Sequence, residues 1–178
     1  MVCASSLLLA ACHIEDDSID PLHIATDSSY VDTDLGYSLA FPQGWWVGLE
    51  PIVSREDFQA STCQPGVDGK PQEYAMPTMF GSHSKSSGSS LRSFLEAAYD
   101  TLPAPYYDSV RVRASQTRSG VEVIPVDLWY SYSSVHYAVR ELYFLRRNQR
   151  VRLHFSARSG FLESHAGLKF IDSSLTFF

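Results

Sequence analysis

Apolar and polar residues alternate with a period of two through most of the second half of the chain, which indicates β-strands. The alternation is clearest at 37–41, 110–114, 121–132 and 150–157. Residues 135–145 become apolar on both faces in their second half, which is typical of a strand covered from both sides. The apolar phase reverses at Ile124–Pro125, and this reversal predicts a β-bulge.

A helical period replaces the alternation in two places. Apolar residues at 91, 94, 95, 98 and 102 follow the i, i+3, i+4, i+7 pattern, with Ser90 placed to cap the helix and Pro103 to end it. A second, shorter helix is predicted at 161–170, followed by an extended apolar tail at 173–178. Pro77 predicts an edge strand around Met76–Phe80, and the serine-rich segment 82–90 predicts a flexible connector.

The order of elements is therefore strands, a helix, a four-stranded meander and a second helix. This order predicts an antiparallel β-sheet with helices packed on its faces, in the α/β (α+β) class. We expect residues 36–178 to form this one globular domain.

The first residues have a different character. Residues 2–11 are small and apolar, and Leu9-Ala10-Ala11-Cys12 resembles the lipobox of bacterial lipoprotein signal peptides. The resemblance implies that 1–11 is a signal peptide and that Cys12 is acylated, which anchors the protein to a membrane. No Lys or Arg precedes the apolar run. Two alternatives stay open: a true start upstream, or an apolar terminus on a cytoplasmic protein.

An acidic segment follows Cys12. Residues 12–35 carry seven carboxylates and the first Arg comes only at Arg55, without any regular apolar period. We interpret 12–35 as a flexible tether between the membrane and the globular domain.

The globular part resembles the PsbP-like family, named for an extrinsic subunit of photosystem II. The similarity rests on YSLAFPQGWW at 37–46, on the Ser-introduced helix LRSFLEAAYDTLP, and on the meander that runs from His154-Phe155 to Ser174 and Phe177. It implies an α/β/α sandwich and a non-enzymatic binding or assembly module. Bacterial members are often exported or lipid-anchored, which agrees with the interpretation of Cys12 as an acylated cysteine.

Charge is distributed unevenly along the chain. The 14 Lys and Arg against 20 Asp and Glu give a net charge of −6, which argues against nucleic acid as a partner. Arginines nevertheless gather in 106–160. Arg111 and Arg113 share one strand face, and Arg150, Arg152 and His154 share another. We expect these five residues to bind an acidic protein partner or an anionic ligand. The alternative is a solvated strand face whose charges prevent edge pairing.

The sequence gives weaker signals for catalysis and for metal binding. Four histidines (His83, His136, His154 and His165) and several aspartates are candidates for a hydrolase, but no Gly-x-Ser-x-Gly turn occurs. Histidine and cysteine spacings do not match a metal site, and Cys63 is interpreted as an inert loop thiol. We expect no catalytic residues, no metal and no cofactor.

These observations together predict a lipid-anchored protein of the bacterial cell envelope, with its domain on the periplasmic or extracellular side, that acts as a non-catalytic binding or assembly module. A small periplasmic hydrolase and a carrier of an apolar ligand are the alternatives.

Overall fold

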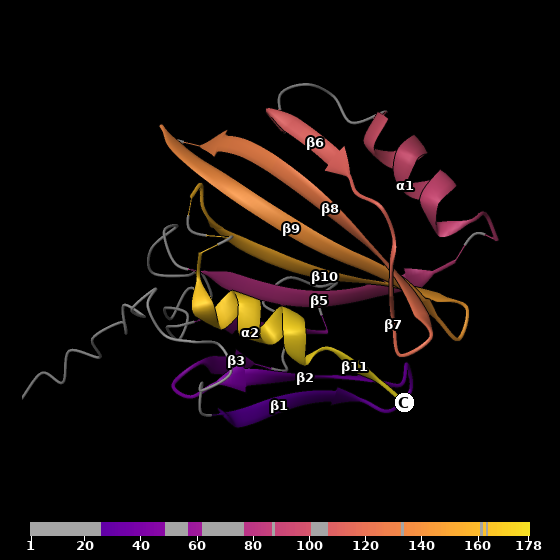
Figure 1. The fold of residues 1–178 in the computed structure, drawn as a ribbon, viewed down its shortest axis with the longest axis horizontal. Helices are drawn as coiled ribbons and strands as arrows, with labels where there is room; N and C mark the ends of the chain where they lie inside the picture. The colour runs from indigo at the N-terminus through magenta and orange to yellow at the C-terminus, as the bar shows by residue number, and fades with distance from the viewer. Residues whose placement is uncertain are drawn as a thin grey trace, which may run out of the picture.

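The fold contains one large and one small antiparallel sheet and two helices (Figure 1). A computed structural model describes residues 26–48, 57–61, 77–86, 88–100, 107–132, 134–160, 162 and 164–178. Its elements are β1 (Thr26–Asp32), β2 (Tyr37–Pro42), β3 (Trp46–Gly48), β4 (Phe58–Ser61), β5 (Thr78–Lys85), α1 (Leu91–Asp100), β6 (Ser109–Val112), β7 (Gln116–Arg118), β8 (Val121–Tyr132), β9 (Val135–Arg146), β10 (Gln149–Arg158), α2 (Ala166–Ser174) and β11 (Thr176–Phe177).

The large sheet has the strand order β3-β4-β5-β10-β9-β8-β6, and β7 also pairs with β8. Its centre is the meander β8-β9-β10, whose long strands are joined by tight turns. The small sheet has the order β1-β2-β11. The predicted antiparallel sheet with helices on its faces is therefore confirmed, with the addition of a second sheet.

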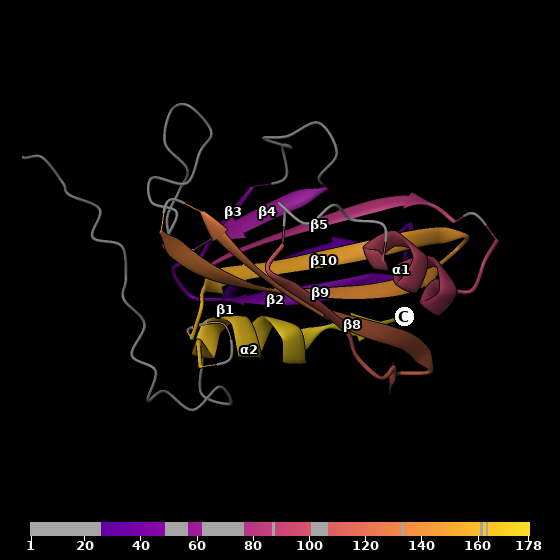
Figure 2. The same cartoon turned by 90° about the horizontal axis from the view of Figure 1, so that it is seen from above.

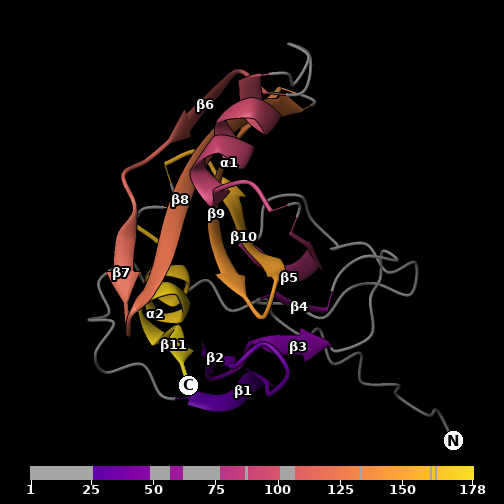
Figure 3. The same cartoon turned by 90° about the vertical axis from the view of Figure 1, so that its right-hand side faces the viewer.

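Two hydrophobic cores lie on opposite faces of the large sheet. One core joins α2 and the small sheet to inward residues of β9 and β10, such as Phe144 and Leu153. The other joins Leu91 and Leu95 of α1 to Ile124 and neighbouring residues of β8 and β9. Figure 3 shows the two helices on opposite sides of the sheet, and Figures 1 and 2 show them towards different ends of its long strands. We call these two sides the α1 face and the α2 face.

Local sequence signals explain the better-predicted elements. Helix α1 begins after Ser90, whose hydroxyl accepts a hydrogen bond from the Ser93 backbone N–H at 3.2 Å, as expected of an N-cap. Its two buried residues, Leu91 and Leu95, are one turn apart and face the sheet. The β9–β10 turn places Arg147 and Asn148 in positive φ, which a two-residue hairpin turn requires. None of the helices in the described ranges is long and apolar enough to cross a membrane.

The ordered body begins earlier than the sequence indicates. Residues 26–35, assigned above to the acidic tether, form β1 and the turn into β2. This strand carries a weak apolar pattern, because Tyr30 packs against Phe58 while Val31 is exposed. The predicted signal peptide (1–11) and residues 12–25 lie outside the described residues.

Four other local predictions are wrong. β5 lies inside the sheet between β4 and β10, although Pro77 predicted an edge; the proline stands just before the strand and blocks no ladder bond. Ser82 and Ser84 belong to this strand and not to a connector. The register of β8 with β9 continues unbroken through Pro125, so the phase reversal reflects a strand buried on both faces and not a bulge. The second helix begins at Ala166, five residues later than predicted.

The turn from β1 into β2 meets the last residue of the described chain beside the β9–β10 hairpin. Arg146 donates from Nε to the Leu35 carbonyl at 2.9 Å and from Nη2 to the Phe178 carbonyl at 2.7 Å. Gly36 lies between them with φ of +68°, and a Cβ there would stand 2.6 Å from the Phe178 oxygen. This crowding explains why a residue without a side chain occupies position 36.

Candidate functional site

The structure separates the five predicted binding residues. Arg150 and Arg152 face α1 and line a groove there, and His154 lies on the same face of β10. Arg113 faces α2 together with Asp127 and Arg140, and Arg111 pairs in register with Asp127 at an exposed position. The five residues therefore do not form one surface, because the two arginine sets lie on opposite faces of the sheet.

The groove on the α1 face runs between helix α1 and strands β5, β9 and β10, and we call it the α1 groove. It encloses about 360 Å³. Its residues are mostly aromatic, hydroxyl-bearing or basic: Ser82, His83, Ser84, Phe94, Ala98, Tyr99, Tyr107, Glu141, Tyr143, Arg150 and Arg152. The alternation of β5 and β10 produces this surface, because their even-numbered residues share one face.

A buried carboxylate forms the floor of the α1 groove. Glu141 is only 3% exposed, and both of its oxygens are hydrogen-bonded. Oε1 accepts from His154 Nδ1 at 2.9 Å, and Oε2 accepts from the hydroxyls of Tyr99 and, at 2.7 Å, Tyr143. Arg152 Nη1 lies 3.7 Å from Oε1. A buried charge needs such compensation, because burying it without partners is very costly.

These contacts set the ionisation of the cluster. Burial alone would raise the pKa of Glu141, but the hydrogen bond and charge of His154, the charge of Arg152 and the hydrogen bond of Tyr99 lower it to about 2. Burial, followed by the nearby charge of Glu141, raises the pKa values of Tyr99 and Tyr143. Glu141 is therefore an anion and both tyrosines are neutral hydroxyls across the physiological range.

The two arginines of the groove are held in place by different contacts. The Arg150 guanidinium lies 3.5 Å from the centroid of the Phe94 ring and donates to the Ser84 hydroxyl at 2.8 Å. Burial lowers the pKa of Arg150, although a guanidinium remains charged at neutral pH. Burial would also lower the pKa of Arg152, but the charge of Glu141 raises it. Both cations are fixed before any ligand arrives, which reduces the entropy cost of binding.

The arginines on the α2 face belong to a different cluster. Asp127 is 2% exposed, and it accepts hydrogen bonds from Arg113 and, at 2.9 Å, from Arg140 Nε. Arg113 and Arg140 line a pocket beside α2. Arg111 does not line it and lies at the surface.

Three of the candidate hydrolase residues meet, but not in the order of a catalytic triad. Ser131 donates to Asp108 at 2.6 Å and contacts His136 Nδ1 at 2.8 Å, so the serine lies between the acid and the histidine. A Ser-His-Asp triad instead needs the histidine between the other two. His83 contacts Asp57, and His165 caps α2. No grouping of three or more metal-ligating side chains occurs in the part of the chain that the structure describes. Cys12 and Cys63 lie outside that part.

Sequence reasoning missed Glu141, Tyr99 and Tyr143, which organise the α1 groove. One signal was available: Glu141 stands in the middle of a strand whose flanking residues are apolar on both faces. A charged residue in such a strand is buried and must have partners. Tyr99 could not be named as a partner, because it lies in α1, more than forty residues from Glu141 along the chain, whereas Tyr143 follows Glu141 by two residues on the same strand face.

Comparison with solved structures identifies the fold. Cyanobacterial PsbP (CyanoP) from Synechocystis sp. PCC 6803 is similar at 14% identity and a TM-score of 0.53, over 90% of this chain and 98% of that one. LpqN of Mycobacterium tuberculosis, described as involved in cell envelope biogenesis, is similar at 16% identity and a TM-score of 0.57, over 86% and 91%. A protein from Bacteroides thetaiotaomicron VPI-5482 has 10% identity and a TM-score of 0.53, over 86% and 49%.

No protein-family profile and no curated protein matches the chain in sequence. At these identities the structural likeness establishes the fold alone. The chain therefore has a PsbP-like α+β fold, as the family resemblance implied, and its function must be argued from its own sites.

Proposed function

We propose that this protein is a lipid-anchored, non-catalytic module of the bacterial cell envelope that docks an acidic segment of a protein partner in the α1 groove. The observation that carries the proposal is the pair of fixed arginines, Arg150 and Arg152, beside aromatic side chains in one groove. The groove-lining residues that the structure describes include these two cations and one carboxylate, Glu141.

Glu141 has a structural part in this proposal. Its oxygens are already bonded to His154, Tyr99 and Tyr143, so it orients the groove's side chains without competing strongly for Arg150. Arg150 is held by Phe94 and Ser84, neither of which is charged. An incoming carboxylate would meet a guanidinium already positioned for a charge-assisted hydrogen bond.

The composition of the groove favours a protein partner. Tyrosine and arginine are enriched among the residues that dominate binding energy at protein interfaces. Phe94, Tyr99 and Tyr107 supply aromatic surface next to Arg150 and Arg152. Such a surface suits an acidic peptide segment whose backbone and apolar side chains cover the rings while its carboxylates reach the arginines.

Two observations support the non-catalytic part. The serine of the Asp108–Ser131–His136 group donates its proton to the aspartate, so His136 does not act on it as a base. The histidine nearest the groove floor, His154, is bound to Glu141 and stacks on Phe80. A measured hydrolase activity that depends on Ser131 would overturn this part.

The anchoring part rests on Leu9 to Cys12. Its test is incorporation of radiolabelled palmitate in a bacterial host, with Cys12→Ser as the variant and Cys63→Ser as the matched control. We expect labelling to vanish only in Cys12→Ser. Labelling that persists in Cys12→Ser would contradict the anchor while leaving the groove unaffected.

The docking part is tested with a defined probe, a fluorescein-labelled octaglutamate peptide, and an octaglutamine peptide as the uncharged comparison. We expect the full chain to bind octaglutamate and the affinity to fall at least about tenfold in Arg150→Glu/Arg152→Glu. Arg158→Glu is the control, because Arg158 lies exposed on the same strand outside the groove. Equal affinity in the double variant and the control would contradict the proposal.

A further inference from the structure

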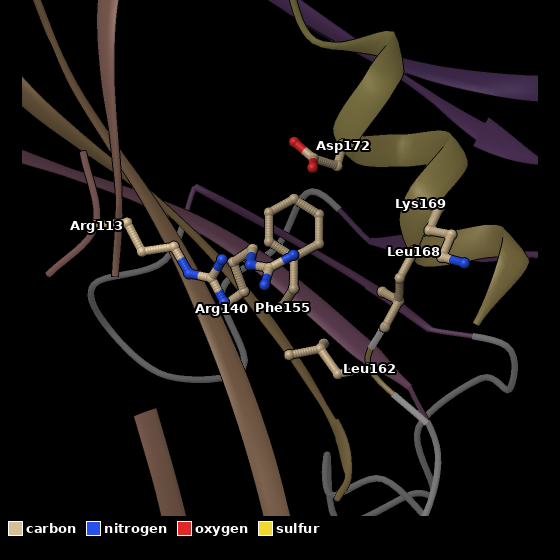
Figure 4. A pocket seen from close by; sticks show the side chains of 7 residues that line it. All are labelled: Arg113, Arg140, Phe155, Leu162, Leu168, Lys169 and Asp172. Carbon is tan, nitrogen blue, oxygen red and sulfur yellow. The ribbon is translucent and has the colours of Figure 1, made fainter. Parts of the chain in front are cut away.

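A second cavity lies on the other face of the large sheet, between α2 and strands β8 to β10, and we call it the α2 pocket. It encloses about 230 Å³. Figure 4 shows Arg113, Arg140 and Phe155 on the strand side, Leu168 and Lys169 on α2, and Leu162 below them. The α1 groove shares none of these residues, so the two sites are independent.

One wall of the α2 pocket is cationic. The buried carboxylate of Asp127 accepts from Arg113 on Oδ2 and from Arg140 on Oδ1, so it fixes both guanidinium groups side by side. Lys169 lies on the helix side of the pocket, and Figure 4 shows its amino group turned away from the two guanidinium groups. Asp172, the one carboxylate among the described lining residues, is held by Arg118 at 2.8 Å. Planar guanidinium groups arranged in this way suit a carboxylate.

The rest of the pocket is apolar. Phe155 and Leu168 are 2% and 3% exposed and belong to the main hydrophobic core, and Leu162 closes the lower side. A neighbouring cavity of about 180 Å³ shares Arg140 and Leu162 and continues towards Trp129. The two cavities are adjacent, and their volumes together reach the range usual for small-molecule sites.

We propose that the α2 pocket binds a linear aliphatic carboxylate. Its head group contacts Arg113 and Arg140, and its chain lies against Leu162, Leu168 and Phe155. The cationic wall selects the sign of the head, and the apolar wall gains free energy by removing the chain from water. This site is separate from the α1 groove, and its test does not depend on the proposal that the α1 groove docks a protein partner.

The first test compares three probes by calorimetry on the full 178-residue chain: octanoate, octan-1-ol and acetate. We expect octanoate to bind at least about tenfold more tightly than either of the others. The alcohol lacks the charge, and acetate lacks the chain. Equal affinity for octanoate and octan-1-ol would show that the pocket does not recognise the carboxylate head group, which would contradict the proposal. No binding of octanoate would also contradict it.

The second test removes one cation. Arg140→Gln leaves Asp127 paired with Arg113 through two nitrogens, so the buried carboxylate keeps a partner. We expect octanoate affinity to fall about tenfold while octan-1-ol affinity is unchanged. The matched control is Arg111→Gln, on the same face but outside the pocket. Octanoate affinity that falls equally in both variants would contradict the assigned site.

A third variant tests the site without removing a charged side chain, and its thermal unfolding shows whether the protein still folds. Leu162→Trp, made in the segment that closes the pocket and not within a sheet strand, fills the cavity with a larger side chain. We expect octanoate binding to be abolished and the thermal transition to persist. Undiminished octanoate affinity in a folded Leu162→Trp protein would overturn the proposal.

Discussion

The two faces of the large sheet are built from the same strands but differ in what they bury. The α2 face buries an apolar core that includes Tyr37, Phe41, Phe144 and Leu153, closed by α2 and the small sheet. The α1 face buries a smaller apolar cluster and, next to it, the charged and hydroxyl-bearing network of Glu141. The α2 face therefore holds the larger apolar core, beside which the buried Asp127 cluster lies, and the α1 face holds the polar network on which the proposed docking depends.

Alternation along β9 and β10 produces this division. On β10, Val151, Leu153 and Phe155 face α2, while Arg150 and Arg152 face α1. A shift of one residue in register would exchange the two sets. The long, unbroken pairing of β9 with β10 and of β8 with β9 therefore maintains both the core and the groove.

The largest effect is expected from the core of the α2 face. Phe144 is fully buried and makes edge contacts with Tyr37 and Phe177. Phe144→Ala should lower the free energy of unfolding by about 3–5 kcal/mol, through lost burial and a residual cavity. Urea unfolding followed by circular dichroism measures it. Leu95→Ala, fully buried under α1, is the comparison on the other face and should cost only about 2–3 kcal/mol. A larger loss of unfolding free energy in Leu95→Ala than in Phe144→Ala would contradict the conclusion that the α2 face holds the main hydrophobic core.

A smaller, pH-dependent effect is expected from Glu141. Its pKa falls from 4.5 to about 2 on folding, so the unfolded chain takes up the proton more readily. Its contribution, about 3 kcal/mol, is fully present above about pH 4.5 and is lost as the pH falls towards 2. The difference in unfolding free energy between wild type and Glu141→Gln should therefore shrink over that interval. A difference that stays constant with pH would show that the carboxylate is not stabilised as described.

A further loss is expected where the β1–β2 turn meets Phe178. Gly36→Ala should cost about 2 kcal/mol, because the new Cβ meets the Phe178 oxygen and the backbone has φ of +68°. Gly44→Ala is the matched control: its φ is +84°, but, apart from its two chain neighbours, no atom of the residues that the structure describes lies within 4 Å of the added Cβ. It should cost about 1 kcal/mol, the backbone strain alone. Equal losses in thermal unfolding would show that the crowding at Gly36 is unimportant.

The smallest effect on stability is expected in the groove itself. Arg150→Gln removes a partly exposed cation that contacts Phe94 and Ser84. It should change the free energy of unfolding by less than about 0.5 kcal/mol, yet reduce octaglutamate affinity about fivefold to tenfold. Lys85→Gln, an exposed cation on the neighbouring strand β5 outside the groove, should change neither quantity. A large loss of stability in Arg150→Gln would make its role structural.

The sequence predicted much of the fold because period and caps are local properties. The alternation in β2 and β8 to β10, and the Ser90 cap of α1, lie within the segments that they specify. β1 was missed because its stability comes from pairing with β2 and from Tyr30 packing on Phe58, which are contacts between segments. The same reason explains the misplaced edge at β5.

The candidate site was predictable only in part. Arg150, Arg152 and His154 were found together because they alternate along one strand. Arg111 and Arg113 were grouped with them by charge, although the register of β6 with β8 places them, like Asp127, on the opposite face. Glu141 and Tyr99 meet only when α1 folds over β9, and no periodicity records that contact.

The most direct test of the central claim is photo-crosslinking in living cells from a position inside the α1 groove. A photoreactive residue at Ala98, which lines the groove, should give a discrete adduct, and one at exposed Thr117 on β7 should not. We predict that Arg150→Glu/Arg152→Glu abolishes the adduct and that Arg158→Glu preserves it. An adduct from position 98 that is unchanged by the double charge reversal would contradict docking through the α1 groove.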